Sequence, residues 1–316
     1  MSVAVGLGLM EFPFSGMADY WRWVDMCEAG GVDSMWQTDR LLSREPILEC
    51  MAAMGALAGR TRRIKFGMNV VSLALRDPVL VAKQCATIDV LSEGRLLPAF
   101  GIGSPRAPEW GALHVDTRTR GRKTDEGLEI ISRLWREDSV DFTGEHYRLT
   151  GATISPKPVQ PDLPMWIGGG SEAAIRRTAR VGTGWQGGPE TPGEAARIVA
   201  AIRAATVEAG RSIDDDHYGA SFPFYFGTAA APPLLKAMEA YTKRTGNPAA
   251  AYFAVGDAGV IVERIAEYIG AGISKFILRP VGSSGEEVSS QSRQLIDEVL
   301  PRVAARWPRK AKAHAP

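Results

Sequence analysis

The sequence of 316 residues contains only three cysteines and four histidines, and this scarcity excludes several kinds of site. Cys27, Cys50 and Cys85 lie within apolar helical patterns and form no CxxC pair, so we expect free thiols buried in the core. Such thiols are typical of a reducing compartment, and we expect the protein to be cytoplasmic. The histidines are too scattered along the chain to indicate a zinc site, so no metal is expected.

A strong net charge and long apolar runs are also lacking. The net charge is +1 and no basic stripe interleaved with aromatic residues occurs, so binding to nucleic acid or to an anionic membrane is not expected. No apolar run approaches the roughly 20 residues of a membrane span, and the chain starts on the strand-like residues 3–7 without the pattern of a signal peptide. Only the end of the chain is basic, and we expect a disordered tail over residues 308–316.

Short apolar runs alternate with helical patterns through the rest of the chain. Eight runs predict strands, near residues 3–9, 34–38, 64–71, 95–103, 164–167, 184–188, 220–227 and 275–278. Apolar residues at helical spacing follow them, near residues 20–27, 46–57, 78–91, 128–135, 173 onward, 194–209, 260–269 and 295–303. Two stretches interrupt this alternation of strands and helices. We expect excursions at about residues 138–163, with room for a small hairpin, and at about residues 229–255.

The strands are continuous apolar runs rather than alternating ones, which is typical of parallel strands covered on both faces. Strict alternation of strand and helix at this length predicts an α/β fold, a (β/α)8 TIM barrel. A doubly wound sheet is the alternative, but eight strands in that arrangement would usually divide into two cores, and no linker separates the halves. We therefore expect one barrel domain over residues 1–307.

One of these strands leads into three glycines and a helix. Gly168, Gly169 and Gly170 follow the apolar strand, and Ser171 after them has the side-chain oxygen of an N-cap. Since glycine has no Cβ atom, several N–H groups can converge there on an anion at the positive end of the helix. The stretch lacks the lysine of GxxxxGK[ST] and the spacing of GxGxxG, so neither nucleotide motif applies. It predicts a phosphate cradle, and a tight turn that binds nothing is the alternative.

In a barrel the chemistry lies where the strands reach their carboxyl ends. Besides the cradle, the candidate residues at those ends are Glu11, Asp39, Arg40, Asn69, Ser72, Gly103, Ser104, Gln186 and Arg279. Asp39 and Arg40 can instead be a solvated pair that contributes little, and Arg279 can extend its charge at the rim. Trp36 and Trp166 are expected beside or beneath this mouth, where core packing is the commoner role of tryptophan.

Several motifs occur in a fixed order along the chain. The stretch Asp89-Val90-Leu91-Ser92-Glu93-Gly94-Arg95-Leu96, followed by Gly101-Ile102-Gly103, resembles the fourth-strand signature of the luciferase-like family. Further stretches similar to that family lie at residues 77–84, 122–135, 142–147, 155–160 and 164–171, so the resemblance covers about residues 1–300. It implies a barrel that binds reduced FMN or the deazaflavin F420. The likeness is greatest to the branch named for methylenetetrahydromethanopterin reductase, which includes F420-dependent hydride-transfer enzymes.

The resemblance also implies roles for residues of the mouth. The residues implied to bind the cofactor phosphate through backbone N–H groups are Gly169, Gly170, Ser171 and Glu172. The end of the third strand would bulge behind the ring system through a non-prolyl cis peptide, for which Asn69 and Val70 are the best-placed pair. Gly103 and Ser104 would line the polar edge of the ring.

The chain departs from the family at two positions. After the second strand the family commonly has Asp-His, whereas this chain has Asp39-Arg40, the pair that we take as catalytic candidates. Histidine can transfer a proton near neutral pH, but arginine keeps its proton and can only donate hydrogen bonds or pair with an anion. Some F420-dependent sugar dehydrogenases have an acidic residue directly after Gly-x-Gly, where this chain has Ser104. We therefore do not expect a sugar dehydrogenase, and Arg40 indicates an acidic or carbonyl-bearing substrate or a contact with the cofactor tail.

The first interpretation is an oxidoreductase with a small-molecule substrate and F420 or FMN as cofactor, and the fourth-strand motif slightly favours F420 and hydride transfer. With FMN, the protein would be the monooxygenase of a two-component system with a flavin reductase as partner. A barrel that binds flavin without catalysis is a further alternative. A phosphosugar isomerase or aldolase would need a base at a strand end, but Lys275 begins its strand and lies at the opposite end. The second and third helices are apolar on more than one face, which indicates a homodimer through them.

Overall fold

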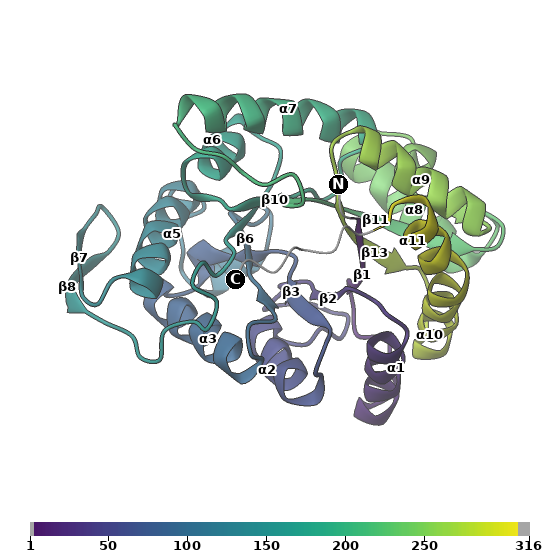
Figure 1. Ribbon diagram of the computed structural model, residues 1–316, viewed down its shortest axis with the longest axis horizontal. Helices are drawn as coiled ribbons and strands as arrows, with labels where there is room; N and C mark the ends of the chain where they lie inside the picture. The colour runs from purple at the N-terminus through teal and green to yellow at the C-terminus, as the bar shows by residue number, and fades with distance from the viewer. Residues whose placement is uncertain (1–2, 309–316) are drawn as a thin grey trace.

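Eight parallel strands close into a barrel in the computed structural model, which describes residues 3–308 (Figure 1). The strands are β1 (Ala4–Leu9), β2 (Ser34–Gln37), β3 (Lys65–Met68) with β4 (Val71–Ser72), β5 (Leu96–Leu97) with β6 (Ala99–Gly101), β9 (Trp166–Gly168), β10 (Gly184–Gln186), β11 (Tyr218–Phe226) and β13 (Lys275–Pro280). β3 and β4 are two halves of one strand, as are β5 and β6. Because β3 pairs with β5 and β4 pairs with β6, the ring is complete, and the predicted (β/α)8 barrel is confirmed.

Helices surround the strands on the outside of the barrel (Figure 1). They are α1 (Met17–Ala29), α2 (Cys50–Arg60), α3 (Pro78–Leu91), α5 (Arg120–Arg136), α6 (Glu172–Val181), α7 (Pro192–Glu208), α9 (Ala258–Gly270) and the run α10 (Gly285–Gln294), η3 (Leu295–Val299, a π-helical turn) and α11 (Leu300–Arg306). The start of α3 illustrates why they begin where they do. The Asp77 carboxylate accepts the N–H groups of Val79 and Leu80 at 2.9 and 3.0 Å, and Pro78 needs no partner because it has no N–H.

Several helical boundaries differ from the prediction. The second helix begins at Cys50 rather than at Pro46, because the carboxylate of Glu49 caps it by accepting the Ala52 N–H at 2.8 Å. The predicted excursion at 229–255 contains α8 (Pro232–Thr245), a 3-10 turn η2 (Ala249–Ala251) and β12 (Ala254–Gly256), which pairs with the outer end of β11. The final helical run begins at Gly285, ten residues before the predicted start at Leu295.

These helices were missed because they bury few apolar side chains. In α8 only Leu234 and Tyr241 are buried, and in α10 the buried residues are Val288, Gln291 and Ser292. A helix of this kind has no apolar stripe that a periodicity search can detect. Two further short helices lie in the loops at the mouth, η1 (Leu73–Leu75) and α4 (Glu109–Ala112).

Tryptophans fill the interior of the barrel. Trp36 and Trp166 belong to a buried cluster completed by Leu97, Ala99 and Ile277. Glycines on neighbouring strands leave the space for them: a Cβ atom on Gly67 would lie 2.7 Å from the Trp36 ring, and one on Gly184 would lie 2.8 Å from the Trp166 ring. Both tryptophans therefore pack as core beneath the mouth, which was the commoner of their two expected roles. At the opposite end, Lys275 at the start of β13 pairs with Asp33.

The first excursion contains the small hairpin, β7 (Val140–Thr143) antiparallel to β8 (Arg148–Ala152), which projects beyond α5 (Figure 1). Its turn is attached to α5 because the Glu126 carboxylate accepts the N–H groups of Glu145, His146 and Tyr147 at 2.8 to 3.1 Å. Of the predicted basic tail, residues 309–316 lie outside the described part of the chain. Among the described helices, none has the length and apolar character needed to cross a membrane.

Candidate functional site

The floor of the barrel mouth is formed by Val70. The peptide bond between Asn69 and Val70 is cis, as predicted, and it separates β3 from β4. The Val70 side chain turns inward onto the tryptophan cluster. Glycines on the adjoining strands make room for it. A Cβ atom added to Gly101 would lie 2.7 Å from Val70 Cγ2, and one added to Gly168 would lie 3.0 Å from Val70 Cγ1. The lumen is therefore closed below by an apolar surface, over which a planar group can lie.

Asp39, at the end of β2, is buried and fully engaged. Its Oδ2 atom accepts the Ser72 N–H at 2.9 Å, and its Oδ1 atom accepts Arg76 Nη2 at 2.7 Å. The Cys50 Sγ lies 3.3 Å from Oδ1, and burial together with Asp39 raises the pKa of this thiol well above its usual range. Arg76 also pairs with Glu49 at 2.8 Å. Asp39 thus ties β4 and the start of α2 to the end of β2, and its predicted catalytic role stays a prediction.

Arg40 pairs with a glutamate that sequence patterns did not indicate. Arg40 Nε lies 3.2 Å from Oε1 of Glu109, the first residue of α4. Glu109 is only 2% exposed, and its Oε2 atom is buried without a hydrogen-bond partner among the described residues. The alternative of a solvated pair between Asp39 and Arg40 is wrong, because each of the two side chains pairs with a different residue. A buried carboxylate oxygen without a protein partner is the kind of group that a bound water or a ligand hydroxyl would satisfy.

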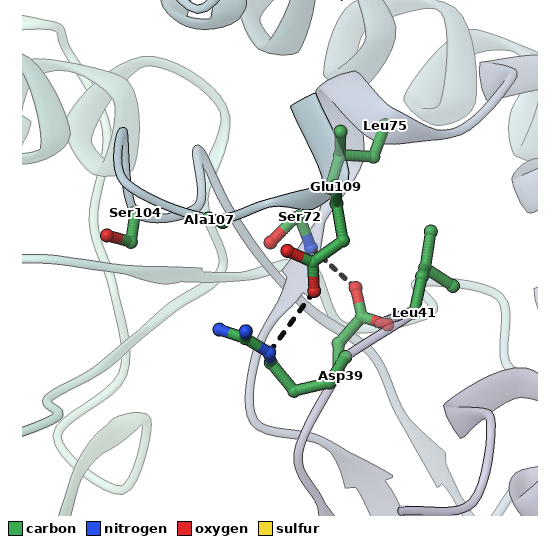
Figure 2. A pocket seen from close by; sticks show the side chains of 8 residues that line it. Asp39, Leu41, Ser72, Leu75, Ser104, Ala107 and Glu109 are labelled. Atoms are coloured by element: carbon green, nitrogen blue, oxygen red, sulfur yellow. Dashed lines mark hydrogen bonds and ion pairs between the residues drawn. The ribbon is translucent and has the colours of Figure 1, made fainter. Parts of the chain in front are cut away.

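A cavity of about 110 Å³ lies between these loops. The residues that line it come from the ends of β2, β4 and β6 and are Asp39, Arg40, Leu41, Ser72, Leu75, Ser104, Ala107 and Glu109. Figure 2 shows the Asp39 carboxylate directed toward the backbone N–H of Ser72, with Glu109 on the same cavity and Ser104 and Ala107 on the adjacent loop. The structure thus brings together four of the predicted candidate residues, Asp39, Arg40, Ser72 and Ser104, around one opening.

Gly103 holds the β6 end of this cavity in place. Its φ of +68° lies in the left-handed region, and a Cβ atom there would stand 2.9 Å from Ser72 Oγ and 3.0 Å from the Trp110 ring. The Trp110 indole N–H donates to the Ser104 carbonyl at 2.7 Å, so the loop after β6 is fastened to α4. This fastening also places Glu109, which precedes Trp110, beside Arg40.

The predicted phosphate cradle lies at the end of β9 and the start of α6. Gly169 has a φ of +104°, and its carbonyl accepts the Trp185 indole N–H at 2.9 Å. Gly170 packs against α7, where a Cβ atom would lie 2.5 Å from Ile198 Cδ1. Ser171 is the N-cap of α6, with Oγ accepting the Ala174 N–H at 3.3 Å, as predicted. Local geometry therefore requires glycine at both positions.

The N–H groups of this cradle are not used by the protein. Within residues 3–308, no hydrogen bond has the N–H of Gly170, Ser171, Glu172 or Ala173 as its donor. The first N–H groups of a helix have no intrahelical acceptor and carry the positive end of its dipole. The residues present therefore fit a phosphate group.

Arg279 and Gln186 complete the mouth. A Cβ atom on Gly8 would lie 2.7 Å from Ile277 and 3.6 Å from Arg279 Cγ, so Arg279 starts from the inner face of β13. Its guanidinium donates to the Tyr252 hydroxyl, lies 5.6 Å from the centre of that ring, and places Nη1 2.8 Å from the sulfur of exposed Met10. Gln186 is 2% exposed, and its Oε1 atom has no partner among the described residues.

Glu11 is the candidate that the structure leaves out of this group. It is exposed, and in the described part of the chain it makes no hydrogen bond or ion pair. Of the residues that sequence reasoning missed, Arg76 follows a 3-10 turn and Glu109 lies in a four-residue helix. Neither lies at a strand end, where a barrel fold predicts site residues.

The sequence matches the profile of a known protein family. The sequence profile of luciferase-like monooxygenases matches residues 14–244. An uncharacterized protein of Mycobacterium tuberculosis is 34% identical over 169 residues, which are 53% of this chain and 57% of the relative. The F420-dependent glucose-6-phosphate dehydrogenase of Amycolatopsis mediterranei is 30% identical over 185 residues, covering 54% of this chain and 53% of that enzyme. In both alignments the chain spans little more than half the length of the curated relative.

Solved structures share the fold. Monooxygenase RslO1 from Streptomyces bottropensis has a TM-score of 0.81 at 21% identity, covering 95% of this chain and 100% of that chain. An F420-dependent secondary alcohol dehydrogenase in complex with an F420–acetone adduct has a TM-score of 0.81 at 18% identity, covering 96% of this chain and 99% of that chain. The oxygenating constituent of 3,6-diketocamphane monooxygenase from Pseudomonas putida, in complex with FMN, has a TM-score of 0.77 at 17% identity, covering 96% of this chain and 99% of that chain.

Proposed function

The chain belongs to the luciferase-like monooxygenase family, and we propose that it is an oxidoreductase that uses F420 to transfer hydride to or from a small organic substrate. The observation that carries the proposal is the set of four N–H groups at the start of α6 that no group of the described chain accepts. They lie at the same end of the barrel as the Val70 floor. When bound, F420 supplies a ring carbon that accepts or releases a hydride.

The chain's own groups have separate tasks in this proposal. The N–H groups of residues 170–173 would bind the cofactor phosphate. Val70 would support one face of the ring, and Ser104 would lie at its polar edge. The loops that carry α4 and η1 would exclude water from the reacting atoms, because Gly103 packs against Ser72 and Trp110.

In this proposal Glu109 is the residue that transfers a proton to or from the substrate. The family histidine is replaced by Arg40, which cannot release a proton at neutral pH. Glu109 is the acidic side chain next to Arg40; it lines the cavity, and its Oε2 atom has no hydrogen-bond partner among the described residues. Arg40 would hold the carboxylate in place, so that a hydroxyl or carbonyl oxygen of the substrate could exchange a proton with Oε2.

Arg40 and Arg279 favour a substrate with an acidic or carbonyl group. Both guanidinium groups lie at the mouth, and Arg279 Nε is buried without a partner among the described residues. A guanidinium group recognises a carboxylate or phosphate through parallel N–H donors. With Arg40 at the histidine position, we do not extend sugar oxidation from the glucose-6-phosphate dehydrogenases to this chain.

The choice of F420 over FMN rests on the curated relatives. Five F420-dependent glucose-6-phosphate dehydrogenases share 26% to 30% identity with the chain, and the one from Microbacterium testaceum aligns over 89% of it. Titration of the purified protein with F420 and with FMN, followed by absorbance and fluorescence, tests the choice. We expect F420 to bind at least tenfold more tightly. Tighter binding of FMN would overturn the choice, and binding of neither would overturn the function.

An FMN-dependent monooxygenase is the second candidate. The likeness in fold to RslO1 and to the diketocamphane enzyme in complex with FMN favours it, since the barrel accommodates that cofactor. Such an enzyme needs a flavin reductase to supply reduced FMN. Free reduced FMN consumes oxygen by itself, so the informative readout is transfer of an oxygen atom from ¹⁸O₂ to an organic substrate. Such transfer with reduced FMN and a reductase, absent without the protein, would support this candidate. A barrel that binds a ring cofactor but turns over neither carbonyl compounds nor oxygen would indicate the non-catalytic alternative.

We also propose a homodimer through α2 and α3. Leu80 and Leu91 on α3 are 55% and 60% exposed, although both are large and apolar. The exposed residues of α2 include Ala52, Ala56 and Gly59, which are small enough for a second helix to approach closely. Analytical ultracentrifugation should show a dimer that Leu80→Asp dissociates. A wild-type monomer at working concentration would refute the dimer.

A further inference from the structure

A partly buried carboxylate lies beside the phosphate cradle. Glu190 belongs to the loop between β10 and α7, and its Oε1 atom is 3.3 Å from the position that a Cβ atom on Gly170 would occupy. Its Oε2 atom accepts the Gly188 N–H at 2.5 Å. Since Gly170 provides one of the free N–H groups of the cradle, the negative charge of Glu190 lies next to the place where an anion would bind.

Three tyrosines hold the Glu190 loop in this position. Tyr268 donates its hydroxyl to the Glu190 carbonyl at 2.7 Å, Tyr252 to the Gly188 carbonyl at 2.9 Å, and Tyr241 to the Pro189 carbonyl at 3.1 Å. The rings of Tyr241 and Tyr252 are stacked with their centres 4.5 Å apart. The loop therefore cannot carry the carboxylate away from the cradle without breaking several hydrogen bonds.

Glu190 has no cationic partner in residues 3–308, where no ion pair includes it. The charged groups near it are Glu194 on α7 and Arg244 on α8. Glu194 is occupied with the Thr191 N–H at 2.8 Å and with Asn247. Burial raises the pKa of the Glu190 carboxyl, while the Gly188 N–H acts in the opposite direction. A carboxylate that is withdrawn from water without a cationic partner lowers the stability of the fold. Its position beside an anion site therefore indicates that its charge has a role in selecting the anion.

We propose that Glu190 makes the cradle selective for a phosphate diester, which carries one negative charge, over a phosphate monoester, which carries nearly two. F420 holds its phosphate as a diester, whereas FMN has a monoester with a second pKa near 6. The four N–H groups and the helix dipole can neutralise part of one charge. The second charge of a monoester meets the carboxylate of Glu190 instead. This inference rests on the proposed function, and it gives the physical reason for the preference for F420.

The test measures four dissociation constants in wild type and in Glu190→Gln. The ligands are F420, FMN, riboflavin and the phosphate-free deazaflavin chromophore of F420, so that the ring and the phosphate contribute separately. Glutamine keeps the size of the side chain and an oxygen for the Gly188 N–H. We expect FMN to bind about tenfold more tightly to the variant, F420 to change less than about threefold, and the two phosphate-free ligands to be unchanged. Glu208→Gln, an exposed charge removal at the far end of α7, should change none of them.

Equal gains for FMN and riboflavin, or no gain for FMN, would overturn the role of Glu190 while leaving the proposed function intact, provided that F420 binds to the wild type. Binding of neither phosphorylated cofactor would overturn both. Should Glu190→Gln fail to fold, wild-type protein supplies a second measurement. As pH rises from about 5.5 to 7.5 and the FMN phosphate gains its second charge, the ratio of FMN to F420 affinity should fall, and a constant or rising ratio would overturn the inference.

Discussion

Replacing Asp39 by asparagine separates an anchoring role of this residue from a catalytic one. The carboxylate accepts Arg76 Nη2 at 2.7 Å and the Ser72 N–H at 2.9 Å. The two side chains of the ion pair are 2% and 12% exposed, so water screens their interaction weakly. Asparagine has nearly the same shape but no charge and one acceptor oxygen instead of two. Asp39→Asn therefore removes the ionic partner of Arg76 and one of the hydrogen bonds that join β2 to β4.

The expected loss of stability follows from these contacts. Removing one partner of a buried ion pair typically costs about 3–5 kcal/mol in the free energy of unfolding. Arg76 retains its contact with the more exposed Glu49 at 2.8 Å, so we expect the low end of that range, about 3 kcal/mol. For a domain of a few hundred residues this corresponds to a fall in Tm of roughly 6–10 °C.

Urea unfolding and calorimetry of Asp39→Asn, Arg76→Met and the double variant measure the effect. The double variant should lose less than the sum of the single losses, with a coupling energy of about 1–3 kcal/mol. The matched control is Asp116→Asn, whose partner Arg118 is 89% exposed, and it should leave stability unchanged. An Asp39→Asn protein as stable as wild type but without activity would refute the anchoring role and support the catalytic one.

Three further predictions concern the site and its pH dependence. Glu109→Gln should lower kcat about 100-fold with little change in cofactor affinity, and an unchanged kcat would exclude proton transfer by Glu109. Gly170→Ala should weaken the binding of F420 and FMN about tenfold and leave the binding of riboflavin unchanged, because the new Cβ atom meets Ile198 at the cradle. The control Gly193→Ala adds its Cβ atom in open space and should change none of these affinities. Burial alone would raise the pKa of Glu28, but the N–H groups of residues 62–64 outweigh it and lower that pKa. The stabilisation by Glu28 is therefore present above its unfolded pKa of about 4.3 and is lost as pH falls below it, so Tm should fall less on acidification in Glu28→Gln than in wild type.

The elements that the sequence predicts correctly are those with a local cause. Asp77 before Pro78 predicts the start of α3, and Ser171 after three glycines predicts the start of α6. Both depend on atoms a few residues apart, which every chain with that sequence would bring together. The helices α8 and α10 escape prediction because they bury few apolar residues and are held by contacts with the rest of the barrel.

The candidate site divides in the same way. Its cradle and the bulge at Val70 lie at strand ends, where the barrel topology makes them visible, and the family resemblance pointed to the cis peptide at Asn69. Glu109 and Arg76 were not foreseen, since a glutamate in a loop helix and an arginine after a 3-10 turn look like ordinary surface residues. The sequence shows that the histidine and the acidic residue of the sugar dehydrogenases are replaced by Arg40 and Ser104, whereas the structure places a carboxylate from a different loop beside Arg40.

The amino-acid sequence alone determined the order of strands and helices, the barrel and the glycine turn before α6, because each depends on apolar periodicity or on capping over a few residues. The tertiary structure decided the ionic partners. Asp39 meets Arg76 across 37 residues of chain, and Arg40 meets Glu109 only because β2 and β6 both end at the same mouth. Charges pair with whatever the closed barrel brings within a few ångströms, and that distance is a property of the assembled fold rather than of any stretch of sequence.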